Sequence, residues 1–307
     1  MKKITIIIVN YNTKDLLIKC IQNLLDIYPN KEIIAVDNGS TDGSPDGVKS
    51  NFNSNQIIFI ESENKGLSAG YNLGLSKASG DYILYLGTDA FPDQKTISGI
   101  VNYFDDQENK NVGIATTKLI TRDGKADMDA HRVFQTPWST ITHLAFLDRI
   151  FPKSRLFNQY FMGYQDFSKP HEIDACISHF MFVRKEVHEK IGNWDEDYFL
   201  YGEDLDFCYR AKEAGFKVMY LPQWETLHYK GASVGRKTVK DLDDGSKKNA
   251  TVKHVLSKER THAMKLFVQK HLIDKYPKPL IWLIYLGIFI LQLQRTIEAE
   301  LTFRLQK

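Results

Sequence analysis

Residues 3–44 read KITIIIVNYNTKDLLIKCIQNLLDIYPNKEIIAVDNGSTDGS, and this stretch decides the fold. Its β-branched run at 4–9 predicts a buried strand, and apolar residues at helical spacing over 16–25 predict a helix. A second apolar run at 32–36 predicts another strand, which ends in a turn-rich segment. Strands joined by a helical crossover are typically parallel, so we expect an α/β fold with helices on both faces of the sheet.

The same alternation continues through the first half of the chain. Short apolar runs at 57–60, 82–86 and 112–116 predict three more strands, with helical stretches between them. In an open α/β sheet, ligands bind outside the carboxyl ends of the strands. Polar clusters follow the strands at 4–9, 32–36 and 82–86, so we expect a ligand site at that edge.

The second half of the chain has a less regular pattern. Residues 120–170 are rich in aromatic side chains and show no clear period. A strand-like run at 176–183, a helix at 203–214 and a short strand near 218–221 are predicted beyond them.

The C-terminal part differs in composition. Residues 230–278 hold 13 Lys or Arg against 5 Asp or Glu, a local charge of +8 that leaves −6 for the rest of the chain. Residues 280–293 are apolar except for Gln292. A helix of that length measures about 21 Å, less than the roughly 30 Å of a bilayer core. Two interpretations stay open: a helix on an anionic membrane surface, or one packed on its own domain or a partner chain.

Composition excludes several classes of protein. The 307 residues are 43% hydrophobic and 25% charged, as in folded soluble proteins rather than disordered or disulfide-stapled chains. A net charge of +2 gives no indication of nucleic-acid binding, so we expect no nucleic-acid partner. Three scattered cysteines form no CxxC pair, and the first apolar run is too short for a signal peptide. Both observations favour a cytoplasmic location.

Aromatic and acidic residues follow the first two strands. Asp37 comes directly after the second strand, where a carboxylate can accept the N3–H of a pyrimidine. Tyr11 follows the first strand, and its ring could stack on such a base. The residues around Asp37 also favour a simple turn, which is the alternative interpretation.

A glycine-rich segment precedes the predicted strand at 82–86. Residues 64–74 read NKGLSAGYNLG, with glycines four apart at the head of a helix. Such glycines let the backbone approach a phosphate, whose charge the helix N-terminus favours, and Lys65 could neutralise part of a diphosphate. Beyond the strand, Asp89 is placed where a carboxylate would hold a divalent cation that bridges two phosphates. An ordinary loop aspartate is the alternative.

Acidic and aromatic residues are mixed in a later segment. Residues 192–210 read GNWDEDYFLYGEDLDFCYR, and His228 follows them. Aromatic neighbours can place a carboxylate in a partly desolvated pocket. Alternatively, Glu203 and Asp204 merely favour the start of a helix, a preference of about 0.3–1 kcal/mol.

In this order and spacing, the segments resemble the large inverting glycosyltransferase family two with the GT-A fold, above all its bacterial rhamnosyltransferase-like branch. The resemblance covers about residues 3–235 and is carried by NYN, VDNGSTDGS, NKGLSAGYNLGL, LYLGTDA and WDEDYFLYGEDLDFCYRAKEAG followed by His228. It implies a Rossmann-like, mostly parallel sheet with helices on both faces and a C-terminal helical tail. The implied parts are a glycosyltransferase domain at 1–235, with a nucleotide-sugar-binding half at 1–118 and an acceptor and catalytic half at 119–235, and a basic and apolar helical extension at 236–307.

The resemblance implies an activity. A sugar would move with inversion from a nucleoside-diphosphate donor to an acceptor hydroxyl, with Mg²⁺ or Mn²⁺ as cofactor. By likeness to the branch, the donor is dTDP-rhamnose, with UDP-hexoses as the alternative. We expect the acceptor to be a glycan carried on a polyprenyl diphosphate in the assembly of a bacterial surface polysaccharide, which would account for the basic and apolar tail. We expect segment 120–170 to shape the acceptor cleft, and 230–307 to contact the inner face of the membrane peripherally; a homo-oligomer stays open.

The resemblance also implies roles for individual residues. Donor contacts fall on Tyr11, Asp37, Asn64, Lys65, Gly66, Asn72 and Thr88. Asp89 and His228 match metal ligands, and Asp204 matches the base that deprotonates the acceptor hydroxyl. Support for the acceptor falls on Glu203, Trp194 and Asp195. The Gly87-Thr88-Asp89 element offers one carboxylate where many relatives have two, although the rhamnosyl-like branch usually has Asn-Pro-Asp there, also with one acid.

Three other classes fit the sequence less well. A dinucleotide oxidoreductase would need G-x-G-x-x-G after the first strand. A sugar nucleotidyltransferase would need a glycine-rich, basic loop there, where the chain has Asn10-Tyr11-Asn12-Thr13. A catalytically silent homologue would bind donor and turn over nothing, and the intact Glu203-Asp204 pair argues against it.

Overall fold

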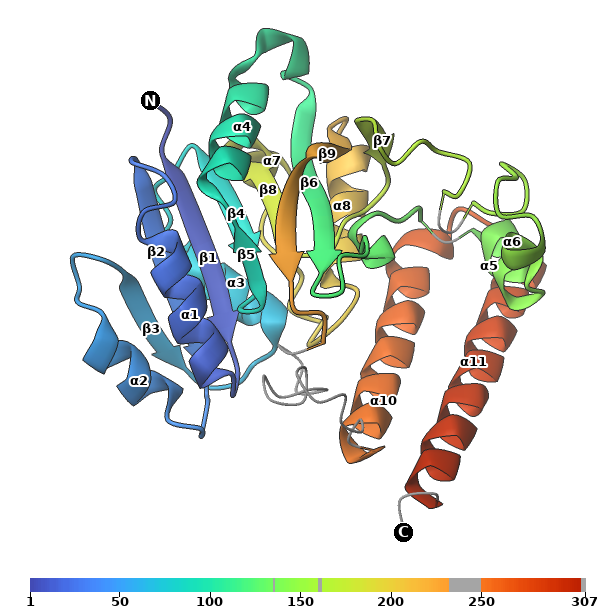
Figure 1. Ribbon diagram of the computed structural model, residues 1–307. Coiled ribbons are helices and arrows are strands. Elements are labelled where there is room, and N and C mark those ends of the chain that lie inside the picture. Colours follow the sequence, from blue (N-terminus) through green and yellow to red (C-terminus); the bar gives the residue numbers. More distant parts are fainter. Residues whose placement is uncertain (135, 160–161, 232–249, 305–307) are drawn as a thin grey trace.

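A central sheet organises the chain. The computed structural model describes residues 1–134, 136–159, 162–231 and 250–304 (Figure 1). Within these residues one nine-stranded sheet has the order β3-β2-β1-β4-β8-β6-β9-β5, and β7 pairs with β9.

The N-terminal half of the sheet is parallel, as predicted. Its strands are β1 (Ile4–Asn10), β2 (Lys31–Asn38), β3 (Ile58–Ser62) and β4 (Tyr82–Leu86), joined by α1 (Lys14–Leu24), α2 (Ser44–Asn51) and α3 (Leu67–Leu75). The carboxyl ends of these strands therefore meet at one edge.

The other half is mixed. It contains β5 (Ala90–Pro92), β6 (Val112–Thr121), β7 (His171–Ile173), β8 (Phe180–Arg184) and β9 (Lys217–His228). The fifth predicted strand, β6, does not continue the parallel run, because β8 lies antiparallel between β4 and β6. Phe180, Met181, Phe182 and Val183 are all fully buried, which suits β8 to a central position covered on both faces. β9 is longer than predicted and passes Pro222 at a register shift.

Helices cover both faces of the sheet, as predicted. On one face, α1 and α4 (Gln94–Asp105) pack with Ile6 and Ile8 of β1. On the opposite face, α3, α7 (Lys185–Ile191) and α8 (Glu203–Glu213) pack with Ile7. Successive residues of a strand point to opposite faces, so this one strand belongs to both cores.

Segment 120–170 holds short helices that its sequence period does not show. They are α5 (Pro137–Leu144), α6 (Leu147–Ile150) and a 3₁₀ turn at Met128–Ala130; another 3₁₀ turn, Gln107–Asn109, precedes β6. Helices this short complete too few turns to give a period. The start of α5 has a signal nonetheless, because Thr136 and Ser139 form a capping box around Pro137.

The C-terminal extension forms two long helices. They are α10 (Ala250–Phe267) and α11 (Lys278–Arg304), separated by a π-helical turn at Val268–Leu272. Ile281, Ile284 and Ile288 of α11 are buried in one cluster with Tyr209 of α8. One face of α11 therefore packs on its own chain, which was one of the two interpretations. Part of the basic stretch, 232–249, lies outside the described residues.

Candidate functional site

Asp37 lies at the edge where the parallel strands end. It is 2% exposed, and its carboxylate accepts hydrogen bonds from Asn10 Nδ2 at 2.8 Å and the Ser40 N–H at 2.9 Å. Tyr11, the next residue after β1, is 50% exposed. The structure thus fixes the carboxylate at the ends of β1 and β2 and leaves Tyr11 exposed, and contact of either residue with a base stays a prediction.

The glycine-rich segment packs tightly against a later loop. Asn64 Oδ1 accepts the Gly66 N–H at 3.1 Å, and Lys65 is exposed. Gly66 has φ +96°, and a Cβ there would lie 2.7 Å from the Phe199 carbonyl oxygen. That carbonyl also accepts the Leu67 N–H at 2.7 Å. The observed role of Gly66 is close packing, and donor contact there stays a prediction.

Asn72 holds the loop that precedes α8. Its side chain exchanges hydrogen bonds with the backbone of Trp194, each 2.9 Å long. Trp194 is 2% exposed and stacks on Phe207 at 4.4 Å between ring centroids. Asp195 pairs with Lys270 of the C-terminal extension. The observed contacts of these residues join α3, α8 and the extension, and donor or acceptor contact stays a prediction for each.

Asp89, His179 and His228 converge at the end of β4. The Asp89 Oδ1 atom lies 3.7 Å from Nε2 of His179 and 3.7 Å from Nε2 of His228. The three ligand atoms lie within 4.8 Å of one another. Atoms that each lie about 2.1 Å from one cation are at most about 4.2 Å apart, so a small inward movement would complete a site.

Asp127 orients His228. Its Oδ2 atom lies 2.9 Å from His228 Nδ1, and Lys230 pairs with its other oxygen. Burial would raise the pKa of Asp127, but hydrogen bonds from His228 and Lys230 outweigh it and hold the pKa well below its usual value. An ionised carboxylate only accepts, so Nδ1 carries the proton. The Nε2 lone pair of His228 then faces Asp89, and this buried nitrogen makes no hydrogen bond to any described residue. A carboxylate that orients a ligating histidine is typical of metal sites, and the residues fit a divalent cation.

His179 is a candidate ligand that the sequence analysis missed. It precedes β8, and its carbonyl accepts the Gly87 N–H at 3.1 Å. A Cβ on Gly87 would lie 2.8 Å from the His179 ring. Glycine therefore replaces the first acid of the expected D-x-D element and leaves room for an imidazole. Burial lowers the pKa of His179, which favours the neutral, ligating form.

Asp204 lies in the first turn of α8 and is paired with Arg132. The Arg132 Nη2 atom is 2.6 Å from Asp204 Oδ2. Its neighbour Glu203 is 4% exposed, and burial together with the Asp204 charge raises the pKa of Glu203 to about 8. The raised pKa favours the protonated form of Glu203 at neutral pH.

Electrostatics connect Asp204 with the cluster. Burial lowers the pKa of His179, and the negative charges of Asp89 and Asp204 both act to raise it. Thr88, next to Asp89, is buried, and its Oγ1 lies 3.1 Å from Oγ1 of Thr13. The candidate base, the candidate metal ligands and the end of β4 thus belong to one region.

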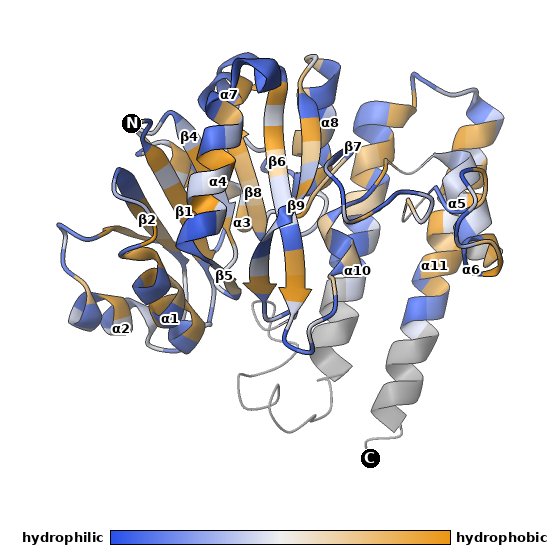
Figure 2. Cartoon of the chain, turned by 45° about the horizontal axis from the view of Figure 1, so that its top comes forward, coloured by the Kyte–Doolittle hydropathy of each residue, from blue (hydrophilic) through white to orange (hydrophobic). Residues whose placement is uncertain are grey.

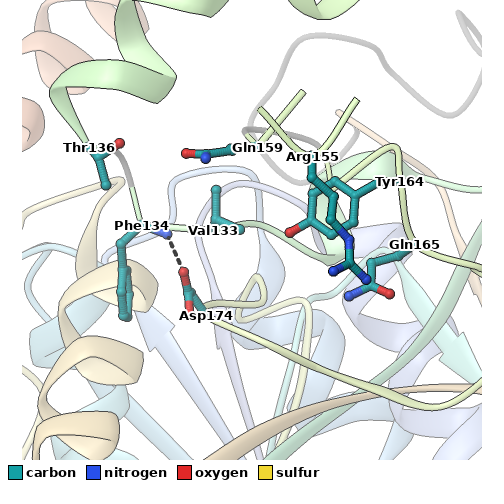
Figure 3. A pocket seen from close by; sticks show the side chains of 8 residues that line it. All are labelled: Val133, Phe134, Thr136, Arg155, Gln159, Tyr164, Gln165 and Asp174. Carbon is teal, nitrogen blue, oxygen red and sulfur yellow. Dashed lines mark hydrogen bonds between the residues drawn. The ribbon is translucent and has the colours of Figure 1, made fainter. Parts of the chain in front are cut away.

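A pocket of about 420 Å³ with a mixed polar and apolar lining begins one residue after Arg132 (Figure 3). It is lined by Val133, Phe134, Thr136, Arg155, Gln159, Tyr164, Gln165 and Asp174. Asp174 accepts the Phe134 N–H at 3.0 Å and pairs with Lys212. Amide, hydroxyl and guanidinium groups beside aromatic rings suit a ligand that carries many hydroxyls. Residues of segment 120–170 line most of this pocket, and a role for them in acceptor binding stays a prediction.

Sequence comparisons agree with this picture. Residues 5–192 match the family described as glycosyl transferase family 2. Rhamnosyltransferase WbbL of Escherichia coli strain K12 is 26% identical over 156 residues, which are 50% of this chain and 53% of WbbL. N-acetylglucosaminyl-diphospho-decaprenol L-rhamnosyltransferase of Mycobacterium tuberculosis strain H37Rv is 41% identical over 56 residues, 18% of each chain. The chain spans about half or less of the length of these curated relatives.

A solved structure shares the fold. Mannosyltransferase PcManGT from Pyrobaculum calidifontis, in complex with GDP-Man and Mn²⁺, matches with a TM-score of 0.56 and 16% identity. The match covers 97% of this chain and 75% of that one. It confirms the predicted GT-A type architecture.

Proposed function

The chain belongs to glycosyl transferase family 2, and we propose that it transfers a sugar, with inversion, from a nucleoside-diphosphate donor to an acceptor hydroxyl. The observation that carries this proposal is the Asp89, His179 and His228 cluster beside the buried Asp204 carboxylate. Transfer from such a donor needs both features, because a diphosphate leaves as a hydroxyl loses its proton.

The donor we propose is dTDP-rhamnose. The rhamnosyltransferases among the relatives support it, although their low identity or short overlap leaves a UDP-hexose as the alternative. Tyr11 would stack on the base and Asp37 would accept its N3–H. Asn64, Lys65, Gly66, Asn72 and Thr88 are the further donor contacts we propose.

Asp89, His179 and His228 would hold the divalent cation, Mg²⁺ or Mn²⁺. When bound, such an ion neutralises charge on the departing diphosphate. The chain's own contribution is to orient both imidazoles. Asp127 orients His228, and the space left by Gly87 accommodates the ring of His179, whose burial lowers its pKa.

Asp204 would remove the proton of the acceptor hydroxyl. In the single displacement that inversion requires, this oxygen attacks the anomeric carbon while the bond to the diphosphate breaks on the opposite face. Arg132 holds the carboxylate in place, and neutral Glu203 leaves it as the charged acid of the pair. Proton transfer by a positioned base contributes about 10²–10⁴-fold to the rate.

The acceptor we propose is a glycan on a polyprenyl diphosphate, used in surface polysaccharide assembly. Its sugar would lie in the pocket lined by Gln159, Tyr164 and Gln165. This pocket begins one residue after Arg132, which pairs with Asp204. Such an acceptor is presented at a membrane, so we place the enzyme in the cytoplasm, with peripheral contact through 230–307.

A thermal-shift panel tests the donor and the metal together. The folded protein is melted with dTDP-, UDP- and GDP-sugars, each with and without Mn²⁺ or Mg²⁺. Stabilisation grows with ligand concentration relative to Kd, so we expect a metal-dependent shift with dTDP-rhamnose. A shift with a UDP-sugar instead would keep the enzyme class and change the donor.

A catalytically silent homologue is the competing function. The absence of a thermal shift with every sugar nucleotide would contradict donor binding, and therefore both the active transferase and the silent homologue. A shift without turnover on a polyprenyl-linked acceptor would favour the silent homologue.

A further inference from the structure

The exposed apolar side chains of this chain are concentrated in two segments. Among the described residues, eighteen large hydrophobic side chains are exposed, and twelve of them lie in 137–156 or in α11. The twelve are Trp138, Ile141, Phe146, Ile150, Phe151, Leu156, Trp282, Leu283, Leu286, Phe289, Ile290 and Leu293. Single exposed hydrophobic residues are ordinary, but a concentration of this kind marks an interaction surface.

Over residues 280–291, helix α11 is apolar on all its faces. Ile281, Ile284 and Ile288 are buried against the domain, whereas Trp282 is 76% exposed and Phe289 60% exposed. A helix on the surface of a soluble protein has a polar outer face. Residues 278–296 are long and apolar enough to cross a membrane, yet only 17% of them are buried. The outer face of α11 therefore needs an apolar neighbour.

The two segments belong to one region of the molecule. Helix α5 contacts α11, and α5 contacts α6. Both short helices lie beside α11 at the end of the molecule away from β1 to β3 (Figure 1), and hydrophobic residues line α11 there (Figure 2). We call the twelve side chains on these segments the apolar surface.

The charges on these segments are almost all positive. Residues 137–156 and 278–296 together contain five Lys or Arg and one acid, Asp148. Asp148 is 3% exposed and faces His143, 2.7 Å away. Arg149, Lys153 and Arg155 are exposed. The apolar surface is thus bordered by an excess of positive charge, which complements anionic lipid headgroups.

We propose that the apolar surface docks on an anionic lipid bilayer, with 137–156 and the outer face of α11 inserted together. This inference deepens the proposed function and rests on it, since it gives the lipid-linked acceptor a route. Arg155 borders both the apolar surface and the pocket, so docking would hold the pocket at the headgroup level. The contact requires a segment from the catalytic domain as well as the C-terminal extension.

Two other arrangements account for fewer observations. A transmembrane α11 would have to abandon the packing of Ile281, Ile284 and Ile288. A second copy of the chain on this surface would place the excess positive charges of both copies near one another, which is unfavourable.

Vesicle flotation of the full chain tests the proposal. Vesicles of phosphatidylcholine are compared with vesicles in which part of the lipid is phosphatidylglycerol. Two double variants are used, F146S/F151S in the catalytic domain and W282S/F289S in α11. The matched control is Ile58→Ser, because Ile58 is exposed and apolar on β3, outside the apolar surface.

We expect the unchanged protein and the control to float with anionic vesicles, and added salt to weaken this binding. Each double variant should bind on the order of tenfold more weakly, because both segments insert. Binding lost only in W282S/F289S would overturn the composite surface, and so would equal binding by all variants or no binding at all.

Analytical ultracentrifugation gives the remaining outcome. A dimer that both double variants dissociate, without vesicle binding, would make a second copy the occupant and overturn the proposal. Thermal shifts with sugar nucleotides are measured on the same variants. Retained shifts show that the fold and the donor site survive, so failure of docking is separate from failure of the glycosyltransferase function.

Discussion

The two halves of the sheet edge supply the candidate site in different ways. In the parallel half, Asp37 is one of the last two residues of β2, and Asp89 lies in the turn that follows β4. In the mixed half, Arg132 and His179 come from loops, and their partners lie 72 and about 90 residues away along the chain. Functional residues that follow parallel strands lie at an edge that the sequence predicts. Residues near an inserted antiparallel strand reach the site only through the tertiary fold, so the sequence does not reveal their partners.

Replacing the proposed base should give the largest effect. In Asp204→Asn, we expect kcat to fall about 10²–10⁴-fold, because the amide cannot take the acceptor proton. Nucleotide affinity should change little, since the side chain pairs with Arg132 rather than with the residues at the end of β2. Transfer assays and titration calorimetry with the nucleotide measure the two quantities.

The companion variant Arg132→Gln sharpens this result. It leaves Asp204 present but removes its partner, so kcat should fall less than in Asp204→Asn. Lost nucleotide binding in folded Asp204→Asn would instead place this carboxylate on the donor or the metal.

Metal affinity is the next largest effect. His179→Ala should weaken Mn²⁺ binding at least tenfold, although His179 lies outside the motifs recognised from the sequence. Asp127→Asn should weaken it about 10–100-fold, as expected when the residue that orients a ligand is lost. Calorimetry with Mn²⁺ and nucleotide measures both, with His171→Ala as a control at a histidine outside the cluster. Unchanged affinity in His179→Ala would leave the site to Asp89 and His228.

The sequence predicted the site unevenly, for physical reasons. Asp37 and Asp89 could be placed because their strands are local apolar runs with an invariant geometry at the edge. His179 carries no local signal, since its role depends on the space beside Gly87. Trp194 and Asn72 were expected near substrate, and the structure shows that they also bond to each other, because motif letters do not reveal packing contacts. Their substrate contacts stay predictions. The helices at 137–150 complete too few turns for a helical period to show in their sequence.

A substitution of Gly87 tests whether His179, from the mixed half of the sheet, restricts which side chains fit after β4 in the parallel half. Gly87→Asp restores the second acid of a D-x-D element, yet we expect metal affinity to fall. The new Cβ would lie 2.8 Å from the His179 ring and 3.0 Å from Asp89 Oδ1, so the histidine must move. Overpacking of this kind also costs about 1–3 kcal/mol of stability. Tighter Mn²⁺ binding in Gly87→Asp would show that the imidazole is dispensable.

The smallest effect concerns the pH dependence of stability. Glu203 has an ordinary pKa when unfolded and one raised to about 8 in the folded chain, chiefly by burial. The folded state thus binds the proton more tightly, so its stability should fall as pH rises from about 4.5 to 8 and then level off. Glu203→Gln keeps a neutral side chain at every pH and should flatten that part of the Tm profile, whereas the exposed Glu189→Gln should leave it unchanged. A slope that persists in Glu203→Gln would mean that Glu203 is ionised at neutral pH. Two adjacent charges would then share the start of α8, and Asp204 would no longer be distinguished from its neighbour as the base.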